Sequence, residues 1–348
     1  MNGRDLLARL LSYPPMPTAA ARNAVLIAAA LALVAIVLAA ALALPGTTFT
    51  TFALWDPLIF VDNAYRLQQG QFPHREFHSS LGVLTMLFPY LGLELGGSFG
   101  ACLPTALALV LVTATPLAIY VLATRVRLAI ALPYGVFLLL VIASPMTPGG
   151  VPSKITMALW YNRECWALLA LLFTLYLPPY ARTAMVRAAD GLVAAIVILV
   201  LVYTKITYGL VALTFPVLWW VLDKDARRSA VLAAALVAAV IVAIELIWGL
   251  NRLYLADIAF ALRSGPTLRG GLLQPIDTLF IHAEETMLLL AAALVLWWER
   301  AGSARDYLFL LIVLGAGAGI TNQNTHDYLL ISSSAIIVIA AERLARAG

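Results

Sequence analysis

Charged residues are scarce in this sequence of 348 residues: they make up 11% of the chain, whereas 63% is hydrophobic. A soluble core of this size cannot cover so much apolar surface, and the repeated apolar runs are typical of a polytopic membrane protein. The basic residues stand singly or in pairs between these runs rather than in a patch. A nucleic-acid partner is therefore not expected, despite the net charge of +4.

Cysteine is also rare, and Cys102 and Cys165 are the two in the chain. Both fall inside or beside apolar runs and lack metal-ligand spacing, so packed thiols are expected in preference to a disulfide or a metal site. No signal-cleavage site follows the first apolar run, residues 23–44, which favours a retained anchor over a cleaved signal peptide. We expect one integral-membrane domain, residues 1–348, with no separate soluble domain.

Eleven apolar runs are candidates for membrane spans. They lie near residues 23–44, 81–95, 99–123, 128–144, 165–180, 190–203, 207–222, 229–248, 286–298, 306–320 and 328–341. If all of them crossed, the basic connections would change sides and the positive-inside rule would fail. The weakest run, 81–95, reaches only about 22 Å, against a hydrocarbon core of about 30 Å. It also contains Pro89 and Glu94, so we assign it to an interfacial or re-entrant helix.

Ten spans then remain, which predicts an all-α helix bundle with both termini in the cytoplasm. This arrangement puts the short basic connections inside and all four histidines outside, so the outer side is expected to be the functional face. Its first segment, residues 45–98, is expected to hold interfacial helices. A later outer segment, residues 249–285, is interpreted either as a mobile loop that closes over a substrate or as a solvated linker.

Side chains capable of chemistry gather in the first outer segment, between residues 55 and 82. The apolar spacing there predicts a short helix that ends at Gly70. Asp62 on this helix lies beside the membrane surface, where a carboxylate can act as general base toward an acceptor hydroxyl. The alternative is structural: Asp56 caps the helix, and Asp62 pairs with Arg66 four residues later.

The run FPHREFHSSLG that follows resembles the first periplasmic loop of bacterial GT-C glycosyltransferases. Those polytopic enzymes take a sugar from a polyprenyl-phosphate carrier, and their loop combines an acidic residue at the start of a helix with a G-x-x-P-[YH]-R-D-F run. Asp62 stands where the acid is expected, followed by Asn63 rather than a second acid. The residues that match the run are Gly70, Pro73, His74, Arg75, Glu76 and Phe77, where Glu76 replaces the usual Asp.

Lys205 interrupts an otherwise apolar stretch, residues 192–222, within the sequence YTKITYG. A lysine at this depth is costly unless it faces a water-filled cavity or a negative partner. The K-x-x-x-G interruption resembles one that is frequent in GT-C relatives, which implies contact with the carrier phosphate. We predict that Lys205 lines a cavity open to the outer leaflet; the alternative is a lysine that marks the outer turn between two short spans.

The sequence WYNRECW, residues 160–166, resembles the Tyr-x-Arg element of the same family. Arg163 and Lys154 on this outer segment are expected either to contact a lipid phosphate or to snorkel at the interface. Metal-dependent members carry an acidic pair near here, whereas this chain offers only Glu164. No metal and no other cofactor is therefore predicted.

Together these features predict a bacterial inner-membrane glycosyltransferase that moves a sugar from a polyprenyl phosphate to an acceptor on the periplasmic face, with inversion. The resemblance implies that Asp62 is the base. It further implies that the substrate and its phosphate are bound by Lys205, Arg75, Arg163, Glu76 and His74. Membrane lipid is the surrounding partner, and the acceptor is open. The alternatives are a non-catalytic GT-C-like subunit and a carrier or flippase for a lipid-linked sugar.

Overall fold

The computed structural model describes residues 17–46, 54–144, 156–264, 274–321 and 330–347. These residues form helices and, apart from an isolated bridge between Pro73 and Phe77, contain no strand. The helices are α2 (Pro17–Ala43), α3 (Trp55–Gln68), α4 (Leu84–Gly96), α5 (Phe99–Arg125), α6 (Leu128–Ala143), α7 (Trp160–Thr174), α8 (Ala184–Thr204), α9 (Ile206–Leu222), α10 (Arg227–Trp248), α11 (Leu250–Ser264), α12 (Gln274–Ile281), α13 (Ala283–Trp298), α14 (Ala304–Thr321) and α15 (Leu330–Ala347).

Among the described residues, five helices are long and apolar enough to cross a membrane, namely α2, α5, α8, α10 and α14. Helices α4, α6 and α9 are apolar but shorter, with 13, 16 and 17 residues. The chain is thus an all-helical protein of the multi-pass membrane type, as its apolar runs predicted. The figure of ten spans, which includes the shorter helices, stays a prediction.

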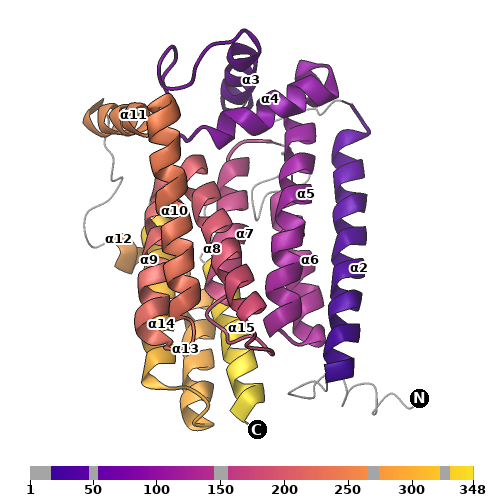
Figure 1. Cartoon of the computed structure of the whole chain (residues 1–348), viewed down its shortest axis with the longest axis vertical. Coiled ribbons are helices and arrows are strands. Elements are labelled where there is room, and N and C mark those ends of the chain that lie inside the picture. The colour runs from indigo at the N-terminus through magenta and orange to yellow at the C-terminus, as the bar shows by residue number, and fades with distance from the viewer. Residues whose placement is uncertain (1–16, 47–53, 145–155, 265–273, 322–329, 348) are drawn as a thin grey trace.

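The long helices run side by side, and the start of α2 and the end of α15 lie at the same end of the bundle, here called the inner end (Figure 1). Helices α3, α4 and α11 lie at the opposite end, here called the outer end (Figure 1). Helix α4 packs against α3 and α5. Its 13 residues rise only about 20 Å, which is short of a hydrocarbon core of about 30 Å, and the assignment of 81–95 as a segment that does not cross stays a prediction.

Helix α7 forms the centre of the bundle, where it packs against α5, α6, α8, α9 and α15. All of its residues from Trp160 to Thr174 are buried, because a helix surrounded by five neighbours has no face left for lipid. The ring of Trp166 packs edge-on against Tyr208 of α9, with centroids 5.8 Å apart. Cys102 and Cys165 are buried free thiols, as the sequence predicted.

Arginine side chains join the helices at the inner end. Nη2 of Arg125 on α5 lies 2.5 Å from Oδ1 of Asp190 on α8, and Nε of Arg127 lies 3.1 Å from Oε1 of Glu342 on α15. Arg346 donates to the backbone oxygen of Arg125 at 3.1 Å. The sequence assigned these three arginines to one side of the membrane, and they do meet at one end of the bundle.

Gly82 fixes the first outer segment to the end of α8. Its N–H donates to the backbone oxygen of Thr204 at 2.9 Å. A Cβ at Gly82 would lie 2.1 Å from the backbone oxygen of Tyr203, so a side chain here would push the loop away from α8. This contact brings the FPHREFHSSLG loop beside Lys205, the next residue of the chain after α8.

Candidate functional site

Asp56 lies in the first turn of α3, but it is not the cap that the structural alternative predicted. Residue Leu54 precedes the helix and no side chain caps it. The half-buried carboxylate of Asp56 instead accepts a hydrogen bond from the backbone N–H of Leu159, just before α7. Burial raises the pKa of Asp56 above its usual value, and the bond from Leu159 only partly offsets this. The first outer helix is thereby tied to the centre of the bundle through Asp56.

Asp62, the base expected from the resemblance, forms the ion pair that the alternative predicted. Its Oδ2 lies 2.7 Å from Nε of Arg66, one helical turn later. The side chain of Asp62 is 56% exposed. Asp62 is six residues from Asp56, which turns it roughly 120° around a helix of about 3.6 residues per turn. The two carboxylates of α3 therefore face different surroundings, and Asp56 is the one that faces α7.

The FPHREFHSSLG loop is held together by hydrogen bonds and a cation–π contact. The carboxylate of Glu76 accepts from the backbone N–H of Phe72. The guanidinium of Arg75 lies 4.6 Å from the ring centroid of Phe72 and donates to the backbone oxygen of Trp248 at 3.3 Å. His74 is 2% exposed and has a positive φ of 61°, a conformation uncommon outside glycine. These three expected substrate ligands thus shape the loop.

Asp257 on α11 is the acceptor around which this loop closes. Its Oδ2 lies 2.8 Å from Nδ1 of His74 and accepts from the N–H of Ser79 at 3.0 Å, while its Oδ1 lies 2.7 Å from Nδ1 of His78. Burial raises the pKa of Asp257, but the bonds from Ser79, His74 and His78 outweigh it, so the pKa lies below its usual value. Asp257 and Tyr254 are three residues apart on one face of α11, a spacing that the sequence reasoning did not use.

Lys205 lies in extended backbone between α8 and α9, with φ −154° and ψ 119°. Its Nζ donates to Oδ1 of Asn162 at 3.1 Å and lies 5.5 Å and 5.4 Å from the ring centroids of Tyr161 and Tyr208. The ammonium therefore sits among ring faces at the start of α7, a cation–π setting. The N–H of Ile206, which the break leaves without a helical partner, donates to the hydroxyl of Tyr254 at 3.1 Å.

The start of α7 brings Asp56 and Lys205 to the same region. Leu159 bonds Asp56, and Asn162 bonds Lys205. Between them, the ring of Phe60 on α3 packs edge-on against Tyr161, with centroids 5.6 Å apart, and Tyr161 in turn contacts the Lys205 ammonium. The sequence singled out Lys205 but missed Tyr161 and Asn162 as its partners.

Arg163 and Glu164 lie inside the bundle rather than on an outer loop. Both are 2% exposed, and Nη1 of Arg163 donates to the backbone oxygen of Ala158 at 3.1 Å. The backbone around the start of α7 is thus held by Arg163 from within. Lys154 and residues 265–273 of the outer segment 249–285 lie outside the described part of the chain, and so do the expectations for them.

Within the described ranges, no three or more His, Cys, Asp or Glu side chains form a group that could hold a metal. His74 and His78 direct their Nδ1 atoms at one carboxylate, which is a hydrogen-bond arrangement.

In comparisons with protein-family models, with curated proteins and with solved structures, nothing matches this chain. The likeness to GT-C enzymes therefore rests on the loop residues, on Lys205 and on the WYNRECW sequence, residues 160–166.

Proposed function

We propose that the chain is a membrane glycosyltransferase of the GT-C type, with ten spans in a bacterial inner membrane and its site at the outer, periplasmic end. It transfers a sugar from a polyprenyl phosphate to an acceptor hydroxyl, and no metal takes part. The observation that carries this proposal is the position of Lys205. A cation placed in a helix break, on the rings of Tyr161 and Tyr208, is linked through Tyr161 and Phe60 to α3, the helix that carries Asp56.

Lys205 is proposed to bind the carrier phosphate. An ammonium in a partly buried setting gains more from a phosphate than it would in water, because screening by solvent is weaker there. Asn162 and the two tyrosine rings hold the side chain in place. In this role Lys205 neutralises the charge that gathers on the phosphate when it leaves.

Asp56 is proposed as the base in place of Asp62. The acceptor oxygen forms a bond to the anomeric carbon, the bond from that carbon to the phosphate oxygen breaks, and the hydroxyl proton passes to the carboxylate. The phosphate departs with the bonding electrons, and the configuration inverts. A raised pKa suits a base, because it makes the carboxylate a better proton acceptor near neutral pH.

Replacement of each aspartate on α3 tests this assignment. In membranes given a labelled polyprenyl-phosphate sugar, Asp56→Asn should lower sugar transfer by about a hundredfold to ten-thousandfold. Donor binding, measured by native mass spectrometry, should be unchanged. The matched control Asp62→Asn, on the same helix, should keep most of the transfer. The opposite result would return the role of base to Asp62, as the sequence alone suggested.

The pH profile gives a second view of the same carboxylate. Because only the ionised form accepts a proton and burial raises its pKa, transfer should be lost on acidification at a pH above the usual range for an aspartate.

Lys205→Met should weaken donor binding, whereas Lys205→Arg should retain part of it. The proposed site would be wrong if the transfer rate stayed the same at acidic pH and in both Lys205 variants.

A non-catalytic GT-C-like subunit is the second candidate, because the acid at the family position, Asp62, is paired with Arg66 at 2.7 Å. Such a subunit would bind the donor through Lys205 and show no transfer of its own. Donor binding without transfer in the purified wild-type chain would favour it. Movement of labelled donor across a sealed vesicle would instead favour a flippase.

A further inference from the structure

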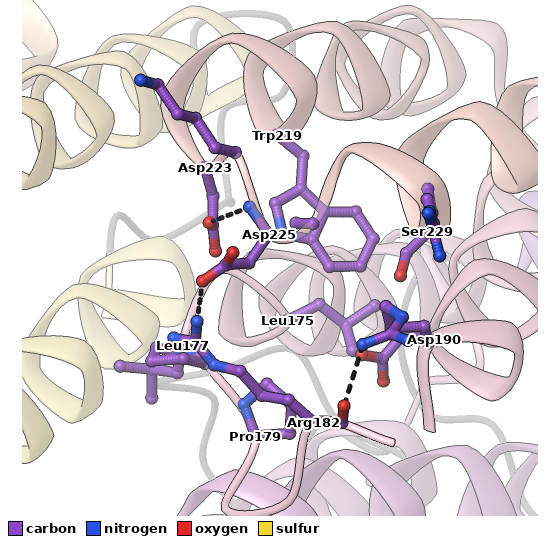
Figure 2. A pocket seen from close by; sticks show the side chains of 14 residues that line it. Leu175, Leu177, Pro179, Arg182, Asp190, Trp219, Asp223, Asp225 and Ser229 are labelled. Carbon is purple, nitrogen blue, oxygen red and sulfur yellow. Dashed lines mark hydrogen bonds and ion pairs between the residues drawn. The ribbon is translucent and has the colours of Figure 1, made fainter. Parts of the chain in front are cut away.

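A pocket of about 260 Å³ lies at the inner end, between the connection that joins α7 to α8 and the turn that joins α9 to α10 (Figure 2). Its apolar wall includes Leu175, Leu177, Pro178 and Trp219. Its polar side chains are Arg182, Arg187, Asp190, Asp223, Lys224, Asp225, Arg228 and Ser229. The pocket is thus apolar on one side and charged on the other, far from the proposed outer site.

The carboxylates of this pocket already have partners. Asp190 pairs with Arg125 at 2.5 Å, Asp225 pairs with Arg182, and Asp223 accepts from the N–H of Asp225 at 2.9 Å. By contrast, Lys224 and Arg228 are exposed. Within the part of the chain that the structure describes, neither of these two takes part in an ion pair. Asp223, whose partner is a neutral N–H, keeps its negative charge, but Lys224 and Arg228 outnumber it, so the balance of charge available to a ligand is positive.

The start of α10 adds neutral donors to these cations. The helix begins at Arg227 after Ala226, and no side chain caps its first turn. Ser229 in that turn is 1% exposed, and its Oγ has no hydrogen-bond partner among the described residues. Figure 2 shows Ser229 on the wall of the pocket, directed toward the space beside Asp190 and Trp219. Free N–H groups, a helix dipole and an unpaired hydroxyl together favour a phosphate.

A second hollow of about 440 Å³ adjoins the first and shares Pro178, Arg182 and Asp223 with it. Three more arginines line this hollow, namely Arg300, Arg305 and Arg343, the last of which pairs with Asp306 at 2.7 Å. Both hollows lie where long apolar helices end, on the side that the basic connections assign to the cytoplasm. At this depth in the membrane, the molecules that combine a phosphate with an apolar part are the phospholipids of the inner leaflet. This leaflet is rich in anionic headgroups.

We propose that the pocket beside Ser229 and Arg228 binds the phosphate of an anionic phospholipid from the inner leaflet. Arg228 and Lys224 pair with the phosphate, the first turn of α10 and the Ser229 hydroxyl donate to it, and the wall around Trp219 receives the adjoining glycerol. A volume of about 260 Å³ is below the range of about 300–1,000 Å³ typical of whole-ligand pockets, which suits a headgroup with its acyl chains left in the bilayer.

The binding of phosphatidylglycerol to the purified full-length chain tests this proposal. Native mass spectrometry in detergent gives the affinity of each variant. Lys224→Gln and Arg228→Gln should each weaken binding by about fivefold, since a cation near anionic lipid contributes about 1 kcal/mol. Ser229→Ala should weaken it further when combined with Arg228→Gln. Arg252→Gln, an exposed arginine at the outer end, is the matched control and should leave binding unchanged.

Lys224 is exposed, so its replacement is not expected to disturb folding, and it keeps the test valid if another variant is unstable. Phosphatidylcholine should bind at least about fivefold more weakly than phosphatidylglycerol, and inorganic phosphate should not displace the lipid. The proposal is overturned if Lys224→Gln binds as the wild type does, or if both lipids bind equally. Full displacement of the lipid by inorganic phosphate would overturn it in favour of a soluble anion.

Discussion

The two ends of this molecule are held together by different chemistry. At the inner end, arginines pair with carboxylates between helices, as Arg125 does with Asp190 and Arg127 with Glu342. At the outer end, a single carboxylate, Asp257, binds two histidines, and a lysine rests on aromatic rings. Arginine keeps its charge at any working pH, whereas histidine titrates near neutrality. The arginines of the inner end therefore keep their charge as the pH changes, whereas the contacts of the outer histidines depend on pH.

The largest effect is expected from the inner end. Both Arg125 and Asp190 are almost fully buried, so Arg125→Ala leaves an unpaired buried carboxylate. Breaking such a pair from one side typically lowers the free energy of unfolding by about 3–5 kcal/mol. Thermal unfolding in detergent should show a clearly lower midpoint for Arg125→Ala.

The control is Asp225→Asn, which breaks the exposed pair with Arg182 at the same end. Exposed pairs contribute about 0–1 kcal/mol, so its midpoint should stay close to that of the wild type. The double variant Arg125→Met with Asp190→Leu should recover much of the loss, because it removes both buried charges. Equal midpoints for Arg125→Ala and Asp225→Asn would show that the buried ion pair stabilises the inner end no more than the exposed pair does.

A smaller and local effect is expected at the outer end. Asp257→Asn removes the charge to which His74, His78 and the Ser79 N–H are bonded. Hydrogen bonds to a charged group contribute about 1.5–3 kcal/mol, so amide exchange in residues 72–79 should become about tenfold faster or more.

Global unfolding of Asp257→Asn should change little, since the loop lies outside the bundle core (Figure 1). Asp277→Asn, at an exposed acid of α12 away from this loop, is the control for a lost surface charge. A fall in the global midpoint as large as that of Arg125→Ala would show that the outer contacts pin the fold as firmly as the inner ones.

The smallest effect is expected from acidification of the wild-type chain. Burial lowers the pKa of His74, while Asp257 raises it and His78 lowers it, and the net shift is downward. Asp257 has a lowered pKa as well. For both groups, the stabilising contribution is complete above the pKa of the unfolded chain and is lost as the pH falls toward the folded value.

Amide exchange of residues 72–79, corrected for its intrinsic pH dependence, should therefore rise as the pH falls below the ordinary range of histidine. Amides of α7 should not respond. His74→Gln should flatten the response of the loop, because the buried titrating group is then absent. Amide exchange in the loop that stays unchanged from neutral to acidic pH would show that the contacts of the outer end depend on pH no more than those of the inner end.

The sequence by itself predicted the class of fold and offered the local pairing on α3 as an alternative to a catalytic Asp62. Apolar runs separated by single basic residues are sufficient for a helical membrane protein, because the length of a run and its lack of charge are local properties. The pair of Asp62 with Arg66 also follows from spacing alone, since residues four apart face each other on any helix. Likewise, the break at Lys205 was visible as a polar interruption.

Tertiary structure decided which side chains meet across the chain. Asp257 is 183 residues from His74 and bonds it, and Asn162 is 43 residues from Lys205 and bonds it. No local period encodes such contacts. They depend on how α11 and α7 pack, and the packing of apolar side chains does not specify one polar partner over another. The choice of Asp56 over Asp62 to face α7 was settled in the same way, by which face of α3 the bundle covers.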